Sequence, residues 1–526
     1  MIKKLKNNIS NIILPIFVFG SITGALTGIT VSIYKFCAKH IIHISEVSYS
    51  FIRGNLYLLF IIVPLLFGIA LLLNLIYKKY PELKGGGIPS SIGILRGILT
   101  FKWLRNLIGT FVLSLLSFLI GVPLGNEGPS VQIGTSIGRA SLLLAGKKNA
   151  AFDRYLLTGG ACSGFSAATG ASISGIMFAI EEAHQRISPM IILISSVSVV
   201  SCRFTSELLA PIFHIETSIF SQFNINSLSL NEFWIPIVIG LMVGLIAVVF
   251  LNYFKLINNT LKKIKNCYKI LFILVSTVIL GLISNSFIST GHELTVELFD
   301  GNYTIYFLVL ILLIRSTLTL FSNSSGLTGG IFLPIIAIGA TFSAILGKIL
   351  ILLGTDQQYY ITILVLGITA CISGMMKMPI TAIVFAVEAL SCQQNILSVI
   401  TVSAITFIIT EIFDAKSIND IVLESRIEQQ NSNKTPLLID TFVTIKKGSF
   451  AIGKQVRDIF WPANLFVLSI NRNNGDAKVD EHGSKALAES DILHIRYLTY
   501  NKENTKNEII AITGDKDFEE KITNEI

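Results

Sequence analysis

The chain has 526 residues, of which 52% are hydrophobic and 14% are charged. Soluble globular domains carry about 25% charged residues, so this composition, with a mean hydropathy of +0.68, excludes an ordinary soluble protein. The formal net charge of +8 is typical of basic loops on the cytoplasmic side of a membrane, and we do not expect nucleic-acid binding.

Windows without a charged residue recur along the chain, and each is long enough to cross a hydrocarbon core about 30 Å thick. A transmembrane barrel would instead show alternating segments of about ten residues, so we predict an all-α polytopic membrane protein. The basic start, MIKKLKNN, predicts a cytoplasmic N-terminus. The windows are Ile9 to Tyr34, Asn55 to Tyr77, Tyr155 to Ile180, Phe233 to Phe254, Ile270 to Gly291, Ser316 to Gly347 and Ala389 to Thr410.

Three stretches rich in glycine and proline interrupt the apolar sequence: KGGGIP, GNEGP and GGIFLP. Irregular backbone at membrane depth is tolerated only where it is buried in protein or lines a cavity, and proline suits the first turn of a helix. We therefore predict helices that begin near Pro89, Pro129 and Pro334. Their N-termini would offer unpaired N–H groups and positive dipole ends to an anion. The alternative is three ordinary kinks or re-entrant turns.

Glu127 is the only charged residue between Arg105 and Arg139. A carboxylate inside a membrane is costly and is by default functional. When ionised, it can occupy an anion-attracting site, and when protonated it is neutral and can leave. We therefore predict a gate that also carries a proton. The alternative role, a cap on a helix N-terminus, is compatible with this one.

The apolar part repeats internally. SGIMFAIEEA, which starts at Ser174, aligns with TAIVFAVEAL, which starts at Thr381, and GNEGP aligns with GIFLP at nearly the same offset. Such duplicated halves are common in transporters, often inverted, with the transport site where they meet. We place the halves at about residues 10–208 and 229–429.

The composition becomes that of a soluble domain after about Arg426. Residues 430–436 are predicted to be a polar linker, NLFVLSINR and DILHIRYL to be strands, and GKQVRDI to be a short helix or turn. We therefore predict a small α+β cytosolic domain over residues 437–500. The charged residues 501–526 are expected to be mobile.

The three motifs GGGIP, GNEGP and GGIFLP together resemble the CLC family of chloride channels and anion/proton antiporters. The resemblance runs from about residue 10 to 429, and the membrane domain is predicted over residues 1–429. The resemblance implies the CLC fold, with two inverted repeats of tilted, broken helices, and a homodimer whose subunits each have a pore. It implies that Glu127 is the gating glutamate and that Glu182 transfers protons from the inside, whereas Glu388, the repeat-mate of Glu181, is structural. The anion-binding residues implied are Gly86, Gly87, Ile88, Gly128, Ile331, Phe332 and Asn419.

Two positions depart from the family pattern. Gly86 stands where the family has a serine whose hydroxyl donates to the anion, and Asn419 stands where it has a tyrosine. Both side-chain donors are altered, so the intracellular constriction should be wider. Discrimination between chloride and nitrate should be weak.

The C-terminal domain resembles the TrkA-C (RCK_C) regulatory domain of potassium-transport proteins, through KKGSFAIGKQVRDI, NLFVLSINRN and ESDILHI. Such domains dimerise, and some bind cyclic di-AMP at the dimer interface. Arg472 and Asn473 are the candidates for contact with a regulatory ligand. The alternative is a dimerisation module that binds no ligand.

The function expected from these features is exchange of chloride or a similar small anion for protons across a bacterial plasma membrane. Both termini would be cytoplasmic. The six cysteines lie singly, without a Cys-x-x-Cys pair, so no metal site is expected, and no constellation of an enzyme is present. The alternatives are a passive anion channel on the same fold and, from the tail alone, a ligand-sensing receptor or a potassium-linked transporter.

Overall fold

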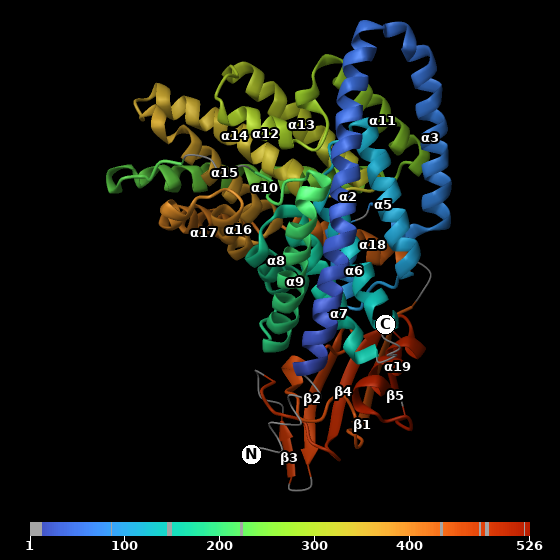
Figure 1. Ribbon diagram of the computed structural model, residues 1–526. Helices are drawn as coiled ribbons and strands as arrows, with labels where there is room; N and C mark the ends of the chain where they lie inside the picture. Colours follow the sequence, from blue (N-terminus) through green and yellow to red (C-terminus); the bar gives the residue numbers. More distant parts are fainter. Residues whose placement is uncertain are drawn as a thin grey trace.

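The computed structural model describes residues 13–85, 87–144, 150–220, 225–431, 435–472, 475–478, 483–519 and 521–525. Packed helices form most of the molecule, and a small β-sheet domain lies at one end, where the long helix α2 also begins (Figure 1). Within the described residues, ten helices are long and apolar enough to cross a membrane. The predicted helical, polytopic architecture with a small C-terminal sheet domain is therefore confirmed.

The membrane domain consists of two successive sets of helices. Short 3-10 turns lie between several of them, at Leu56–Leu58, Pro81–Leu83, Leu230–Glu232, Asn285–Phe287, Gln357–Tyr359 and Gln393–Asn395. The first set is α2 (Leu14–Gly54), α3 (Leu59–Lys79), α4 (Ile88–Leu95), α5 (Trp103–Ile120), α6 (Glu127–Leu144), α7 (Ala150–Thr169), α8 (Ser172–Phe178) and α9 (Pro189–Phe213). The second set is α10 (Trp234–Lys262), α11 (Asn266–Ile283), α12 (His292–Phe299), α13 (Ile305–Ser325), α14 (Phe332–Leu352), α15 (Tyr360–Met376), α16 (Pro379–Glu388) and α17 (Ile396–Ile412), followed by α18 (Ile418–Asn431).

The two sets pack by the same pattern. In the first set α2 packs on α9, α6 on α7, and α7 on both α8 and α9. In the second set α10 packs on α17, α14 on α15, and α15 on both α16 and α17. Each of these helices of the first set thus has a counterpart whose number is higher by eight, which is the arrangement that a duplicated sequence produces.

Two of the membrane-length windows are each divided between two helices. Gly170, at φ +74°, ends α7 and turns the chain into α8, so residues 155–180 do not form one span. Gly326, at φ +83°, ends α13 before the irregular segment that leads to α14. Glycine adopts this left-handed backbone without a steric penalty. Hydropathy is blind to such breaks, because the residues on both sides of them are equally apolar.

Glycines bring the backbones of α6 and α7 into direct contact. A methyl group built at Gly134 would lie 2.1 Å from the carbonyl oxygen of Gly160, and one built at Gly160 would lie 2.0 Å from that of Gly134. Gly138 and Gly164, four residues further along each helix, meet the facing backbone in the same way. Small residues at a spacing of four let membrane helices approach closely. The contact fixes α6, whose first residue is Glu127, against α7.

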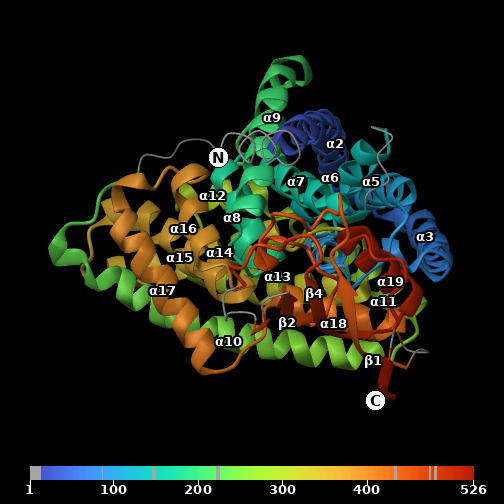
Figure 2. The same cartoon turned by 90° about the horizontal axis from the view of Figure 1, so that it is seen from below.

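The C-terminal domain is a five-stranded antiparallel sheet in the order β3-β2-β4-β1-β5. The predicted strands NLFVLSINR and DILHIRYL are β2 and β4, and a short 3-10 turn, Val456–Asp458, lies in GKQVRDI. Seen from below, the sheet lies across the membrane helices (Figure 2). The elements are β1 (Leu437–Thr444), β2 (Leu465–Arg472), β3 (Gly475–Lys478), β4 (Ile492–Thr499), α19 (Lys502–Thr513) and β5 (Lys521–Glu525).

The expectation of a mobile segment after residue 500 is wrong. The side chain of Asn501 caps α19 by accepting from the amide of Asn504, and Ile509 and Ile512 are buried in the domain core. Strand β5 pairs with β1. The charged residues of this segment obscured a short amphipathic helix. The predicted linker is also shorter, because α18 runs to Asn431 and β1 begins at Leu437; residues 432–434 lie outside the described residues.

We expect Gly160→Val to lower the thermal stability of the protein in detergent. The added side chain must push α6 away from α7, and overpacking of this kind costs about 1–3 kcal/mol. Gly68→Val, on α3, is the matched control, because a side chain built there meets no atom within 4 Å. Equal melting temperatures for the two variants would contradict the close approach of α6 and α7.

Candidate functional site

The three glycine motifs, which are far apart in the sequence, meet at one point. Gly125 and Gly330 form an isolated antiparallel bridge, in which each amide donates to the other's carbonyl oxygen at 2.7 Å. A methyl group built at Gly128 would lie 2.7 Å from the Cα of Gly330 and 3.1 Å from the Cα of Gly87. The backbones of all three motifs are therefore in contact, without side chains between them.

Three helices begin at this point, within two residues of the predicted starts. They are α4 at Ile88, α6 at Glu127 and α14 at Phe332. The first N–H groups of a helix have no partner within it, and the helix dipole is positive there. The converging starts therefore form a positively polarised region inside the apolar domain, which favours a negative charge.

Glu127 supplies a negative charge in this region. Its side chain is fully buried, and neither carboxylate oxygen has a hydrogen-bond partner among the described residues. Its Oε2 lies above Gly125, where a methyl group built on the glycine would be 2.4 Å away. The nearest donors are the backbone amides of Glu127 itself and of Leu333, and neither makes a hydrogen bond of normal geometry. A buried carboxylate without such bonds is costly, so the side chain is only weakly held.

A cavity of about 570 Å³ adjoins Glu127, since it is lined by Asn126, the residue before it, and by Leu333 near the start of α14. Every lining residue belongs to the membrane domain, and none comes from the C-terminal domain. The charged and histidine side chains of the lining are Lys35, Lys39, His43 and His292, together with Glu216, Glu293 and Glu297. The cavity thus gives the glutamate an approach lined by both basic and acidic groups.

Glu182 lies in a π-helical turn, Ala179–Ala183, that follows α8. Its side chain is 5% exposed, and its Oε1 accepts a hydrogen bond from the Nδ2 of Asn419 at 3.0 Å. Arg96 donates to the backbone carbonyl oxygen of Glu182 at 2.8 Å. Such turns occur frequently at functional sites, and here the turn directs a second carboxylate into the protein.

Glu181 and Glu388 hold the two halves together. Glu181 accepts from two amides at the start of α16, at 2.9 and 2.8 Å, and Glu388 accepts from two amides at the start of α8, at 2.9 and 3.0 Å. Each glutamate thus caps a helix of the other half, a favourable position for a negative charge. The adjacent acids Glu181 and Glu182 therefore differ in their partners. Glu181 accepts from backbone amides, whereas Glu182 accepts from the side chain of Asn419.

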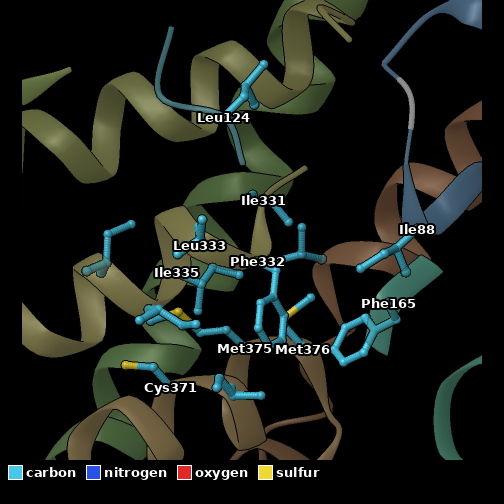
Figure 3. Close-up of a cluster of buried hydrophobic side chains, with 14 of the residues drawn as sticks. Ile88, Leu124, Phe165, Ile331, Phe332, Leu333, Ile335, Cys371, Met375 and Met376 are labelled. Carbon is cyan, nitrogen blue, oxygen red and sulfur yellow. The ribbon is translucent and has the colours of Figure 1, made fainter. Parts of the chain in front are cut away.

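Aromatic side chains surround the start of α14. Phe332 is fully buried and meets Phe165 and Phe385 edge to face, with ring centroids 5.3 Å away in each case. Figure 3 shows Ile88, from the first set of helices, in the same hydrophobic cluster as the consecutive residues Ile331 and Phe332 from the second set. The polarised helix starts are therefore enclosed by apolar groups, where electrostatic interactions are stronger than in water.

Five of the seven residues predicted to bind the anion lie at the converging helix starts. Gly87, Ile88, Gly128, Ile331 and Phe332 lie at or beside the three converging helix starts. Asn419 is instead directed to Glu182, and its Oδ1 has no partner among the described residues. Gly86 lies outside the described residues.

A buried amide network was missed by the sequence analysis. Gln132, on α6, accepts from the amide of Gly87 at 2.6 Å and donates to Asn106 at 2.5 Å, and Asn106 donates to Ser136 at 3.0 Å. The network fixes the start of α4 against α6. Glu127 was singled out because a polar residue inside a membrane is by default functional. The same rule applies to Gln132, five residues later.

The candidate ligand residues of the C-terminal domain are placed only in part. Arg472 forms a bidentate ion pair with Asp491, with N···O distances of 2.6 and 2.5 Å. Its guanidinium is therefore already bound to a carboxylate. Asn473 lies outside the described residues.

Comparison with known proteins covers the membrane domain. The family model described as voltage gated chloride channel matches residues 69–411, more than half of the chain. The H(+)/Cl(-) exchange transporter ClcA of Citrobacter koseri is 28% identical over 369 residues, which are 68% of this chain and 77% of the relative. The ClcA protein of Salmonella arizonae is 27% identical over 435 residues, which are 80% of this chain and 90% of the relative.

Solved structures have the same fold. A slow cyanobacterial Cl−/H+ antiporter superposes with a TM-score of 0.72 at 22% identity, over 79% of this chain and 99% of that chain. A CLC-type fluoride/proton antiporter superposes with a TM-score of 0.64 at 20% identity, over 78% of this chain and 98% of that chain. The C-terminal domain lies beyond the residues matched by the family model. The glycine motifs, the fold and the match together show that this chain belongs to the CLC family, the voltage-gated chloride channels.

Proposed function

We propose that the protein exchanges chloride or a similar small anion for protons across a bacterial plasma membrane. The observation that carries the proposal is Glu127, a buried carboxylate without a hydrogen bond at the meeting point of three helix starts. The related ClcA proteins are named H(+)/Cl(-) exchange transporters. In this proposal the protein moves ions across the membrane and catalyses no chemical reaction.

Competition between the carboxylate and the anion explains how the two fluxes are linked. The amides at the start of α14, at Ile331 and Phe332, and the polarised starts of α4 and α6 attract one negative charge. Ionised Glu127 satisfies this field and excludes the anion. Protonation removes its charge, so the neutral side chain leaves and the anion enters.

Proton delivery from the inside is the role proposed for Glu182. Its carboxylate is nearly buried and lies beside the C-terminal domain, because His184, two residues later, packs on Phe460 with ring centroids 4.6 Å apart. The hydrogen bond from Asn419 fixes its orientation. A carboxylate held inside the protein close to the cytoplasmic face is suited to receive protons and pass them inward.

The orientation and assembly follow the family resemblance. We propose that both termini are cytoplasmic, which agrees with the start of α2 and the sheet domain lying at one end of the molecule (Figure 1). A homodimer is proposed from the family resemblance alone.

The C-terminal domain is proposed to regulate transport through a docked segment. Phe460 is buried, with its ring centroid 4.4 Å from that of Tyr155 on α7, and Arg186 lies 4.7 Å above the ring. Arg154 on α7 forms an ion pair with Glu508 on α19. Movement of this domain would therefore act directly on the segment that carries Glu182.

The ligand of the C-terminal domain is proposed from the resemblance to RCK_C domains alone. Cyclic di-AMP is the candidate, and titration calorimetry on the full chain tests it. Because Arg472 is paired with Asp491, a ligand phosphate at this position would have to displace a carboxylate. The absence of binding would leave dimerisation and docking as the roles of the domain.

We expect Glu127→Gln to abolish proton movement and to leave an anion flux that no longer depends on pH, since an amide neither titrates nor competes. Glu182→Gln should also abolish proton movement but keep the pH-dependent gate. Flux from proteoliposomes under a chloride gradient, with simultaneous proton recording, measures both. Glu424→Gln, on the exposed side of α18, is the control.

Two outcomes would contradict these assignments. If the wild-type protein moves no protons against a chloride gradient, it is a passive channel on the same fold. If Glu127→Gln still drives protons, the gate lies elsewhere.

Weak discrimination between chloride and nitrate is expected, because Gly86 lacks a hydroxyl and Asn419 donates to Glu182. Gly86→Ser should shift the flux ratio toward chloride by restoring a donor. Asn419→Tyr should disturb proton coupling as well, since it removes the partner of Glu182. Strong chloride preference in the wild-type protein, measured as relative flux, would refute the interpretation.

Phe460→Ala should detach the docked segment, because truncation of a buried phenylalanine costs about 3–5 kcal/mol of packing. We expect faster proteolytic removal of the C-terminal domain and an altered ratio of protons to anions. Phe466→Ala, on β2, is the matched control, since Phe466 is 66% exposed. An unchanged ratio despite faster proteolysis would show that docking does not regulate transport.

A further inference from the structure

A second cavity, of about 60 Å³, lies between the loop that precedes α4 and the helices α10, α11, α13 and α18. Its lining includes the cationic side chains of Lys84, Lys262, Lys269 and Arg426. No carboxylate occurs among its lining residues, all of which belong to the described part of the chain. The cavity is distinct from the anion site above and from the cavity beside Glu127.

Only one of the four cations has an acidic partner. Lys262 pairs with Glu428 at 2.7 Å, whereas Arg426 donates to the carbonyl oxygen of Gly85 at 2.7 Å. Within the described residues, Lys84, Lys269 and Arg426 form no ion pair. Three positive charges therefore face the same small space without an acidic partner in the described part of the chain.

The positive charges that line the cavity repel one another, and a bound anion would reduce this repulsion. Lys269 is only 9% exposed. Burial, together with the charges of Lys269 and Arg426, lowers the pKa of Lys84 to about 8; Lys84 itself lies outside the helices long enough to cross the membrane. Like charges repel strongly where water is excluded. In the same lining, the buried hydroxyl oxygen of Ser324 has no hydrogen-bond partner among the described residues.

The cavity shares a wall with the anion site. The amide of Gly85 donates to the carbonyl oxygen of Gly326 at 2.6 Å, and both glycines have left-handed backbone. Gly87, two residues later, touches Gly128 at the meeting point of the helix starts. Arg426 lies on α18, which leads directly to the C-terminal domain, so the cavity lies on the side of that domain.

We propose that this cavity binds a phosphate-type oxyanion, supplied as free inorganic phosphate or as the headgroup of an anionic phospholipid. Inorganic phosphate carries a charge of about −1.5 to −2 near neutral pH, and a phosphodiester headgroup carries a single negative charge spread over two non-bridging oxygens. Both offer several acceptor oxygens to two lysines, an arginine and the hydroxyl of Ser324 at once, whereas a halide is one compact charge. Basic cavities at the cytoplasmic ends of membrane helices are known to bind phospholipid headgroups.

The first test measures thermal unfolding of the purified full chain in detergent at a constant chloride concentration, with added inorganic phosphate or with added gluconate at equal ionic strength. Phosphate should raise the melting temperature of the wild-type protein more than gluconate does, because a ligand bound in the cavity stabilises the folded state. Lys269→Met should weaken phosphate affinity by about tenfold or more, the effect of losing one hydrogen bond to a charged group. Lys84→Met is a second variant, for which the same loss is expected.

Lys416→Met is the matched control, because Lys416 is an exposed lysine that pairs with Glu424 and does not line the cavity. It should keep the full response to phosphate. Without phosphate, Lys269→Met should unfold at an equal or higher temperature than the wild-type protein, since it relieves the repulsion. A lower melting temperature of Lys269→Met in the absence of phosphate would contradict the inference that the positive charges of the cavity repel one another.

The second test distinguishes the two sources of the ligand. In phosphatidylcholine vesicles that contain phosphatidylglycerol, a lipid ligand should stabilise the protein without added phosphate, and native mass spectrometry should detect the bound lipid. Lys269→Met should lose that lipid. Equal shifts with phosphate and gluconate together with no retained lipid, or an equal response to phosphate in the wild-type protein and in Lys269→Met, would overturn the proposal.

Discussion

The structure depends on one backbone contact, the pair of hydrogen bonds between Gly125 and Gly330. These bonds join the corresponding segments of the two halves and set the starts of α6 and α14 side by side. Gly128 completes the contact by touching both Gly330 and Gly87. A side chain at any of these glycines would separate the helix starts, and a weaker field would act on Glu127. The field at the site therefore has its origin in the absence of side chains.

The same principle separates structural acids from functional ones. Glu181 and Glu388 receive two backbone amides each, so their charges are compensated by helix starts of the opposite half. Glu182 accepts from the side chain of Asn419 instead, and the amides near the Glu127 carboxylate make no hydrogen bond of normal geometry with it. The difference between the two classes lies in the partner of each carboxylate. It cannot be read from the sequence, in which Glu181 and Glu182 are two adjacent and identical residues.

The helix starts of the site could be predicted from the sequence because their determinants are local. A proline at the first turn and a glycine before it act within a few residues, so the starts at Ile88, Glu127 and Phe332 follow from short motifs. The hydrogen bond between Glu182 and Asn419 joins residues 237 positions apart and could not be predicted. The helix α19 was missed for another reason. The segment contains many charged residues, so its average composition is that of an exposed tail, although two of its isoleucines are buried.

The contact between the membrane domain and the C-terminal domain is made largely to backbone carbonyl groups. Tyr155 donates to the carbonyl oxygen of Asp458, Arg186 donates to that of Ile459, and Arg154 donates to that of Trp461. Carbonyl oxygens are common to all amino acids, so these hydrogen bonds depend on the course of the loop, whereas Phe460 and the carboxylate of Asp458 add contacts that depend on their side chains. The attachment is thus made mainly by one short loop and α19, and the rest of the C-terminal domain could acquire new ligands or partners during evolution while the attachment is inherited unchanged.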